Sequence, residues 1–204
     1  RRDAIRTNPG PKLRLLGYFA CLGLGYILVE LGLMQRFILF LGHPVYALAV
    51  VLATLLASSG AGSALSSAVS KRFGETGAIT RVVGALAVVL VVYAVALQPL
   101  FTALLGLPLV GRIVLCVLLV ATLGALMGML LPLGVQLAQG AGPEMVPWAW
   151  GINGATSVVG SSLSLIVSMN YGFTTTLLSG LAAYAVGALL LRSGSSGGAP
   201  ASSP

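Results

Sequence analysis

The sequence contains few charged residues and few side chains suited to metal or redox chemistry. Of 204 residues, 7% are charged, with 4 Asp and Glu, one His and 2 Cys. No CxxC motif and no cluster of His, Cys and carboxylate side chains occurs, which argues against a zinc or iron–sulfur centre. A hydrophobic content of 57% and a mean hydropathy of +1.02 leave too little polar surface for a soluble globule. We therefore expect a lipid bilayer to surround the chain.

Long apolar runs fill the sequence between Leu15 and Leu191. A helix of about 20 residues, rising about 1.5 Å per residue, matches the roughly 30 Å hydrocarbon thickness of a bilayer. The runs are continuous and do not alternate, which favours helices over a closed barrel. We predict an all-α, polytopic integral membrane protein with six transmembrane helices. The predicted spans are Leu15–Met34, Val45–Val69, Val82–Leu105, Arg112–Val135, Trp148–Met169 and Phe173–Leu191.

Prolines and one short apolar segment refine these boundaries. The segment Gln35–Gly42 is too short to cross, so we expect an extension of the first helix or a small interfacial turn. Pro44 and Pro147 suit the first turns of the second and fifth helices. Pro99 and Pro132 lie inside spans, where each removes a backbone hydrogen bond and is expected to kink the helix.

The Lys and Arg residues predict the orientation. With six spans, all of the 11 Lys and Arg residues except Arg36 and Arg112 fall on the side of the two termini. The positive-inside rule then places both termini in the cytoplasm of a bacterial inner membrane. Anionic lipid head groups account for the net charge of +7, and no nucleic-acid partner is expected.

The composition divides the chain into three parts. Residues 1–14 form a basic cytoplasmic segment, residues 15–192 the six-helix membrane domain, and residues 193–204 a flexible Gly/Ser/Pro tail. Because the sequence does not begin with Met, we expect Arg1 to be the start of a processed or observed fragment.

Small residues recur at helical spacing in three spans. Helices in lipid approach closely where side chains are small, so these faces are expected to pack against other helices. Asn153 and Ser157 begin a polar stripe in the fifth span, which either packs tightly or lines a polar cavity. The predicted packing residues are Ser59, Gly62, Ser63, Gly124, Gly128, Gly160 and Ser161.

Glu30 is the most informative polar residue because it lies inside the first predicted span. A carboxylate at this depth costs several kcal/mol unless it is protonated or paired. Arg36 lies about 240° further around an ideal helix, so a direct ion pair would require a bend. Gln35, Asn153 or a serine hydroxyl could serve as the partner. Two interpretations remain open: a substrate or proton pathway containing Glu30, Gln35, Arg36, Asn153 and Ser157, or a structural interhelical hydrogen bond.

His43 stands alone next to Pro44 at a predicted membrane boundary. A single histidine there is usually an interfacial hydrogen-bonding side chain, although one imidazole can bind the metal of a haem or chlorophyll. No cofactor and no metal site is expected.

Two segments resemble a known family. These are ELGLMQRFILFLGHPVYALAVVLATLLASSGAGSALS (residues 30–66) and PWAWGINGATSVVGSSLSLIVSMNYGFT (residues 147–174). They are similar to the C-terminal membrane region of bacterial spermidine-synthase-like integral membrane proteins. The resemblance implies a preceding Rossmann-type aminopropyltransferase-like domain, but the chain contains no strand followed by a glycine fingerprint. No catalytic residue is therefore assigned, and the chain by itself is not expected to be an enzyme.

A weaker resemblance is to half of a major facilitator transporter. The segment GSALSSAVSKRFG (residues 62–74) is similar to the loop after the second helix of that superfamily, although the acidic residue expected before the basic pair is missing. This resemblance implies that the six helices form two three-helix repeats.

Two functions follow from these patterns. The sequence slightly favours a noncatalytic scaffold or accessory subunit, with other membrane subunits or a missing soluble domain as partners. The alternative is a transporter-like module that binds or moves a small metabolite, such as a polyamine, through a cavity near Glu30 and Asn153. A carrier would enclose these residues around a cavity, whereas a scaffold would bury them and expose a small-residue face.

Overall fold

The computed structural model describes residues 9–193, which are helical apart from short connections and contain no strand. Five helices within these residues are long and apolar enough to cross a membrane. This confirms the expectation of an all-helical chain suited to a membrane. The helices are α2 (Pro9–Leu41), α3 (Pro44–Phe73), α4 (Glu75–Leu104), α5 (Leu109–Ala141) and α6 (Met145–Arg192).

The outer surface of the helices is apolar. Large hydrophobic side chains point outward, with Val95 74% exposed on α4 and Met169 78% exposed on α6. Exposing such a surface to water would be unfavourable in free energy, whereas contact with lipid chains would not be. Aromatic side chains suited to a membrane interface are exposed near the starts of two helices, Tyr46 in α3 and Trp148 and Trp150 in α6.

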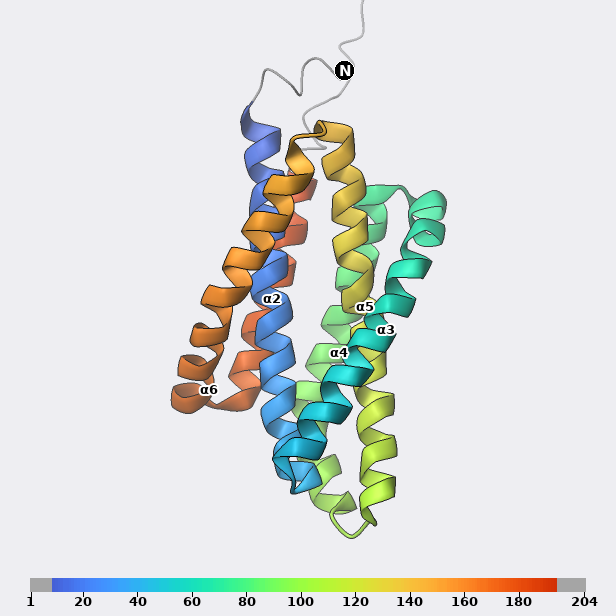
Figure 1. Cartoon of the computed structure of the whole chain (residues 1–204), viewed down its shortest axis with the longest axis vertical. Coiled ribbons are helices and arrows are strands. Elements are labelled where there is room, and N and C mark those ends of the chain that lie inside the picture. Colours follow the sequence, from blue (N-terminus) through green and yellow to red (C-terminus); the bar gives the residue numbers. More distant parts are fainter. Residues whose placement is uncertain (1–8, 194–204) are drawn as a thin grey trace, which may run out of the picture.

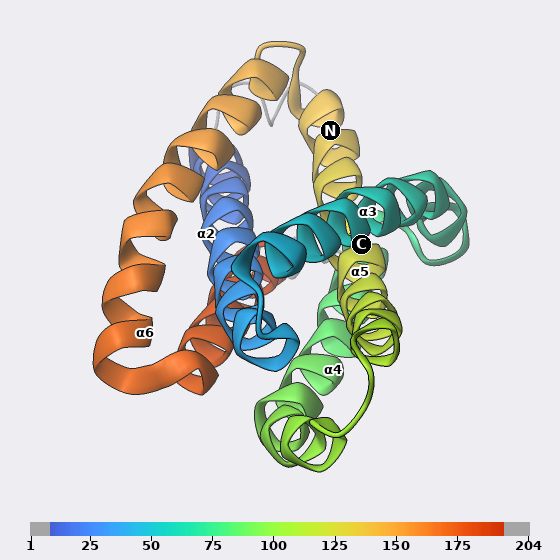
Figure 2. The same ribbon diagram turned by 60° about the horizontal axis from the view of Figure 1, so that its bottom comes forward.

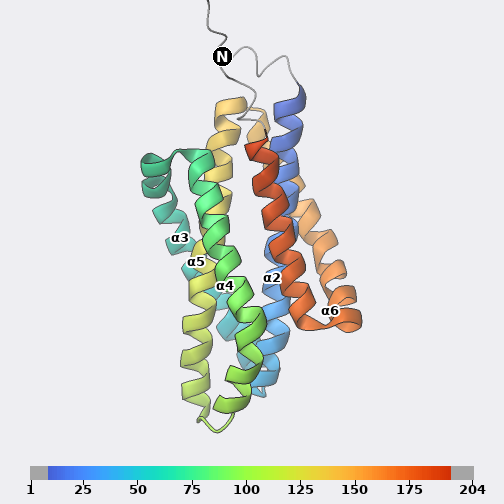
Figure 3. The same cartoon turned by 180° about the vertical axis from the view of Figure 1, so that it is seen from behind.

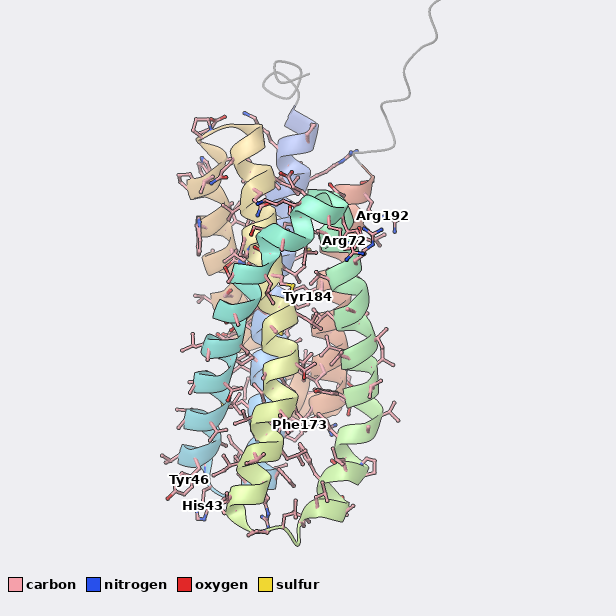
Figure 4. The ribbon with its side chains drawn as sticks, turned by 90° about the vertical axis from the view of Figure 1, so that its right-hand side faces the viewer. His43, Tyr46, Arg72, Phe173, Tyr184 and Arg192 are labelled. Atoms are coloured by element: carbon pink, nitrogen blue, oxygen red, sulfur yellow. The ribbon has the colours of Figure 1, made fainter. Side chains whose placement is uncertain are left out.

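Consecutive helices run in alternating directions (Figures 1 and 3). Figure 4 places Arg72 and Arg192 at one end of the molecule and His43 and Tyr46 at the other. We call these the basic end and the opposite end. The connections are short, and glycines with positive φ occur in three of them, Gly42, Gly74 and Gly142, because such backbone is accessible mainly to glycine.

Helix α6 reverses direction at Gly172. This residue has φ 82° and ψ 168°, which is not helical, and the chain turns back there (Figure 1). We call residues 145–171 the first arm and residues 173–192 the second arm. The prediction of six separate helices is therefore not confirmed as stated. The last two predicted spans correspond to the two arms of α6. A single residue, Gly172, joins the arms, because glycine can adopt the backbone conformation that reverses the chain.

Helix α2 packs mainly against α6, and α3 packs mainly against α5. Figure 2 shows the first arm of α6 on one side of α2, with α3, α4 and α5 on its other side. The α3–α5 contact requires glycine at several positions. A Cβ atom on Gly62 would lie 2.0 Å from the Ala125 backbone oxygen, and one on Gly128 would lie 2.3 Å from the Ser59 backbone oxygen. The two backbones therefore touch without intervening side chains.

Several boundaries differ from the predicted ones. Helix α2 begins at Pro9, six residues before the predicted span, because the polar residues before Leu15 can continue a helix outside the hydrocarbon region. It continues to Leu41, as the helix-extension alternative for Gln35–Gly42 predicted. Pro44 begins α3, and Pro147 lies in the first turn of α6, as predicted. Pro99 and Pro132 lie inside α4 and α5.

The two predicted terminal segments extend beyond the described residues. Residues 1–8 of the predicted basic segment lie outside this range, and residues 9–14 belong to α2. The predicted flexible tail, residues 193–204, lies outside it from residue 194 onward.

Candidate functional site

A cavity of about 550 Å³ lies between the two helix pairs. Helices α2, α3, α5 and both arms of α6 line it, so no single sequence segment forms it. The volume is within the range of roughly 300–1,000 Å³ typical of small-molecule sites. The lining residues are Leu22, Tyr26, Ile27, Glu30, Leu56, Ser59, Gly60, Ser63, Met127, Gly128, Leu131, Pro132, Asn153, Ser157 and Tyr184.

Helix α2 contributes one continuous face to the cavity. Leu22, Tyr26 and Glu30 follow one another at intervals of four residues, so they lie above one another on the same side of the helix. Glu30 is half-buried. It forms no hydrogen bond and no ion pair within residues 9–193, and it is the only acidic side chain among the lining residues.

The first arm of α6 places an amide and a hydroxyl at the cavity wall. Asn153 Nδ2 donates a 3.3 Å hydrogen bond to the Phe19 backbone oxygen, and Ser157 Oγ donates one of 3.2 Å to the Gly23 backbone oxygen. Both bonds join the first arm to α2. The polar stripe therefore packs against α2 and also lines the cavity, so both interpretations of the stripe describe part of the structure.

Glycine at position 23 makes this arrangement sterically feasible. A Cβ atom there would lie 2.2 Å from the Asn153 backbone oxygen and 2.9 Å from Ser157 Oγ. Any larger residue would push the first arm away from α2. Gly160, in the first arm of α6, also allows the two helices to approach closely. A Cβ atom there would lie 2.4 Å from Ile27 Cγ2 of α2.

Tyr184 closes the cavity from the second arm of α6. Its side chain is 2% exposed, and its buried hydroxyl has no hydrogen-bond partner within the described residues. The ring packs against α2, because a Cβ atom on Gly25 would lie 2.9 Å from Tyr184 Cδ2. Figure 4 shows Tyr184 between the helices, away from both ends of the molecule.

Sequence reasoning did not identify Tyr26 and Tyr184 as site residues. Tyr26 carried a usable signal, since it lies four residues before Glu30 on the same helix face. Tyr184 carried no such signal. Its position depends on the reversal at Gly172 and on the packing of the second arm against α2.

The structure separates two of the predicted pathway residues, Gln35 and Arg36, from Glu30. Arg36 lines a different cavity of about 180 Å³, between the ends of α2 and α4. Gln35 lines neither of these cavities, and its buried Oε1 atom has no hydrogen-bond partner within residues 9–193. His43 is exposed at the opposite end, with its ring edge-on to Tyr46 at 5.5 Å between ring centres. No group of three or more His, Cys, Asp and Glu side chains suited to a metal occurs in residues 9–193.

All of the predicted packing residues except Ser161 lie at helix contacts or around the cavity. Gly62, Gly124 and Gly128 lie where α3 meets α5, and Gly160 lies where the first arm meets α2. Ser59 and Ser63 line the cavity. Ser161 Oγ donates a 2.7 Å hydrogen bond to the Val158 backbone oxygen of its own helix.

No protein-family model, curated protein or solved structure matches the chain in any of the three comparisons.

Proposed function

We propose that the chain is a membrane-embedded binding module for a small solute with one ammonium group, and that Glu30 binds this group in the cavity between α2, α3, α5 and α6. The observation that carries the proposal is the position of Glu30. This carboxylate, which has no ion pair or hydrogen bond within the described part of the chain, lies in a cavity large enough for a metabolite. An ammonium ion would compensate the cost of placing that charge at this depth.

The remaining polar groups fit such a ligand. Asn153 and Ser157 supply an amide and a hydroxyl on the α6 side, and Ser59 and Ser63 supply hydroxyls on the α3 side. No Lys, Arg or second carboxylate lies among the lining residues. A single carboxylate suits one positive charge, so a monoamine carrying hydroxyl groups fits better than a polyamine with several charges.

The proposed activity is binding or transport and not catalysis. The residues around the cavity combine one carboxylate with neutral amide and hydroxyl groups, without the nucleophile, base and orienting group that a hydrolase or transferase would need. A solute held between two helix pairs can be released to either side if the pairs rock against each other, as in alternating-access carriers.

Binding of ethanolamine, putrescine and spermidine to the purified protein in detergent tests this function. Ethanolamine is expected to raise the unfolding temperature of the wild type, and Glu30→Gln should lower its apparent affinity by at least about tenfold, as expected for a charge-assisted contact. Glu75→Gln is the matched control, because Glu75 is an exposed residue at the start of α4, outside this cavity. Equal affinity in Glu30→Gln and the wild type would exclude Glu30 as the binding group.

The proposal includes a membrane arrangement in which each arm of α6 crosses the bilayer, giving six spans. The second arm has 20 residues, or about 30 Å at helical rise, which matches the hydrocarbon thickness. The arms run in opposite directions along α2. Asn153 and then Gly160 of the first arm lie against Phe19 and Ile27, whereas Gly180 and then Gly187 of the second arm lie against Val29 and Cys21. The basic end, with Arg72 and Arg192, would face the cytoplasm of a bacterial inner membrane.

Cysteine labelling tests this arrangement. In a variant with Cys21 and Cys116 replaced by Ala, single cysteines are introduced at Tyr171, next to the reversal, and at Ser193. An impermeant maleimide added to intact cells should label position 171 and not position 193. Labelling of both or neither would show that the second arm does not cross.

A scaffold is the second candidate function, and an exposed small-residue face on α3 favours it. Its exposed alanines follow helical spacing on the outer side, where they would allow close approach of another helix. The partner would be a transmembrane helix, either of another membrane subunit or of a membrane anchor attached to a spermidine-synthase-like soluble domain. The face consists of Ala53, Ala57, Ala61, Ala64 and Ala68.

The native mass of the complex in mild detergent tests the scaffold. An assembly larger than the 20.7 kDa chain should be disrupted by Ala61→Trp and retained in Val95→Trp, which alters an exposed residue on a different helix. A monomeric wild type, or equal behaviour of the two variants, would contradict the use of this face.

A further inference from the structure

Arg36 is a buried cation that is not paired with an anion. Its side chain is 7% exposed, and it forms no ion pair within residues 9–193. The partners of its guanidinium are two neutral groups, the Thr174 hydroxyl and Gln98 Oε1, the latter at the long distance of 3.5 Å. Its buried Nε atom has no hydrogen-bond partner among the described residues. Buried charges in proteins are ordinarily paired, because an uncompensated one is strongly unfavourable.

The guanidinium lines a separate cavity of about 180 Å³. Helices α2 and α4 and the start of the second arm of α6 form its walls. Thr174 accepts a hydrogen bond from the Arg36 guanidinium because Gly172 reverses the chain two residues earlier. Figure 4 shows Phe173, another lining residue, away from the basic end. The cavity is lined by Arg36, Leu39, Phe40, Gln98, Phe101, Thr102, Leu105 and Phe173.

Ring stacking and hydrogen bonds fix the positions of the residues around this cavity. The rings of Phe40 and Phe101 stack with 4.2 Å between their centres. Arg112 donates hydrogen bonds to the backbone oxygens of Phe40, Leu105 and Leu107. This second arginine therefore joins the end of α2 to the α4–α5 connection, whereas the Nε donor of Arg36 is used by no group within residues 9–193.

We propose that the Arg36 cavity binds a phosphate-class oxyanion. A guanidinium presents a planar fork of donors that matches phosphate oxygens, and Thr102 and Gln98 add polar groups beside it. Arg36 lies five residues, or about 7.5 Å, before the end of α2, which is near the depth of phospholipid phosphates. The exposed side chains of Leu39 and Leu105 at the cavity rim can contact acyl chains. The phosphate can therefore come from an anionic lipid head group or from a soluble phosphate.

The test uses two probes on the purified full chain: phosphatidylglycerol, counted as adducts by native mass spectrometry, and inorganic phosphate, titrated against thermal unfolding at constant ionic strength. At least one probe should bind the wild type. Arg36→Gln and Thr102→Trp should each weaken that binding by at least about tenfold, because they remove the charge and fill the cavity respectively. Arg81→Gln is the control for loss of one positive charge. Arg81 is exposed and its guanidinium lies over the Phe73 ring at 3.9 Å, away from the cavity.

The pattern of binding identifies the source. Binding of phosphatidylglycerol alone assigns the site to a lipid head group, and protection by inorganic phosphate assigns it to a soluble anion. If Arg36→Gln does not fold, Thr102→Trp decides, since it leaves Arg36, Gln98 and Thr174 in place. Absence of binding to the wild type by both probes would overturn the proposal. Wild-type affinity in Thr102→Trp would also overturn it.

Discussion

The Tyr18 hydroxyl donates a 2.8 Å hydrogen bond to the Leu130 backbone oxygen, and this bond joins α2 to α5. The contact is tight, because a Cβ atom on Gly134, four residues after Leu130, would lie 2.5 Å from Tyr18 Cε1. Helix α2 belongs to the pair with α6, and α5 belongs to the pair with α3. Tyr18 therefore connects the two helix pairs beside the Glu30 cavity, and any rocking of one pair against the other must strain or break this bond.

Tyr18→Phe removes that bond and keeps the ring. We expect a loss of about 0.5–1.5 kcal/mol in the free energy of unfolding, as for a single buried hydrogen bond. Thermal unfolding in detergent measures the change. Tyr46→Phe is the control, because the Tyr46 side chain is 51% exposed. Equal unfolding temperatures of the two variants would show that the bond to Leu130 does not contribute.

Gly128→Ala tests the close contact between α3 and α5. The new Cβ would lie 2.3 Å from the Ser59 oxygen and 2.4 Å from Ser59 Cα, and backbone atoms cannot move aside as a flexible side chain can. We expect a destabilisation of about 1–3 kcal/mol from overpacking.

Gly84→Ala is the matched control, because no heavy atom lies within 4 Å of its added Cβ. Alanine should be neutral there or stabilise the helix by up to about 1 kcal/mol. Unfolding in increasing dodecyl sulfate compares the two variants. A Gly128→Ala protein as stable as Gly84→Ala would mean that α3 and α5 are further apart than described.

Gly23→Ala should weaken ligand binding without altering any side chain that lines the Glu30 cavity. Its Cβ would displace the first arm of α6, which carries Asn153 and Ser157. We expect the affinity for ethanolamine to fall by about tenfold, equivalent to about 1.4 kcal/mol. Gly154→Ala in the first arm, which has open space at its Cβ, should bind as the wild type does. Unchanged binding in Gly23→Ala would remove Asn153 and Ser157 from the site.

The sequence predicted the helices well because the signal for a membrane span is local. The length and hydropathy of each apolar run are sufficient to predict a span. The gap between the predicted spans that end at Met169 and begin at Phe173 contains Gly172, where α6 reverses. The start of α2 at Pro9 was missed, because a hydropathy pattern ends where polar residues begin, whereas helical hydrogen bonding does not.

The arrangement of the candidate sites could be predicted only in part. Glu30 and Arg36 were grouped because they are close in sequence, yet an offset of about 240° places them on different faces of α2. The structure accordingly assigns them to different cavities. Tyr184 could not be assigned from sequence, because no periodicity within the second arm reveals which helix it will contact.

Gly172→Ala tests the reversal on which both cavities depend. The backbone at this position, φ 82° and ψ 168°, lies in a region that is essentially restricted to glycine. No neighbouring heavy atom lies within 4 Å of an added Cβ, so the effect comes from backbone strain and not from a clash. We expect a loss of about 1–3 kcal/mol in the free energy of unfolding.

Gly140→Ala is the control for this substitution, since it is a helical glycine with equally open space. Because Thr174 and Tyr184 both follow the reversal, strain at Gly172 should also weaken phosphate binding at Arg36 and amine binding at Glu30. The two affinities, measured with inorganic phosphate or phosphatidylglycerol and with ethanolamine, should fall together in Gly172→Ala. A loss of only one of them would show that the other cavity forms independently of the second arm.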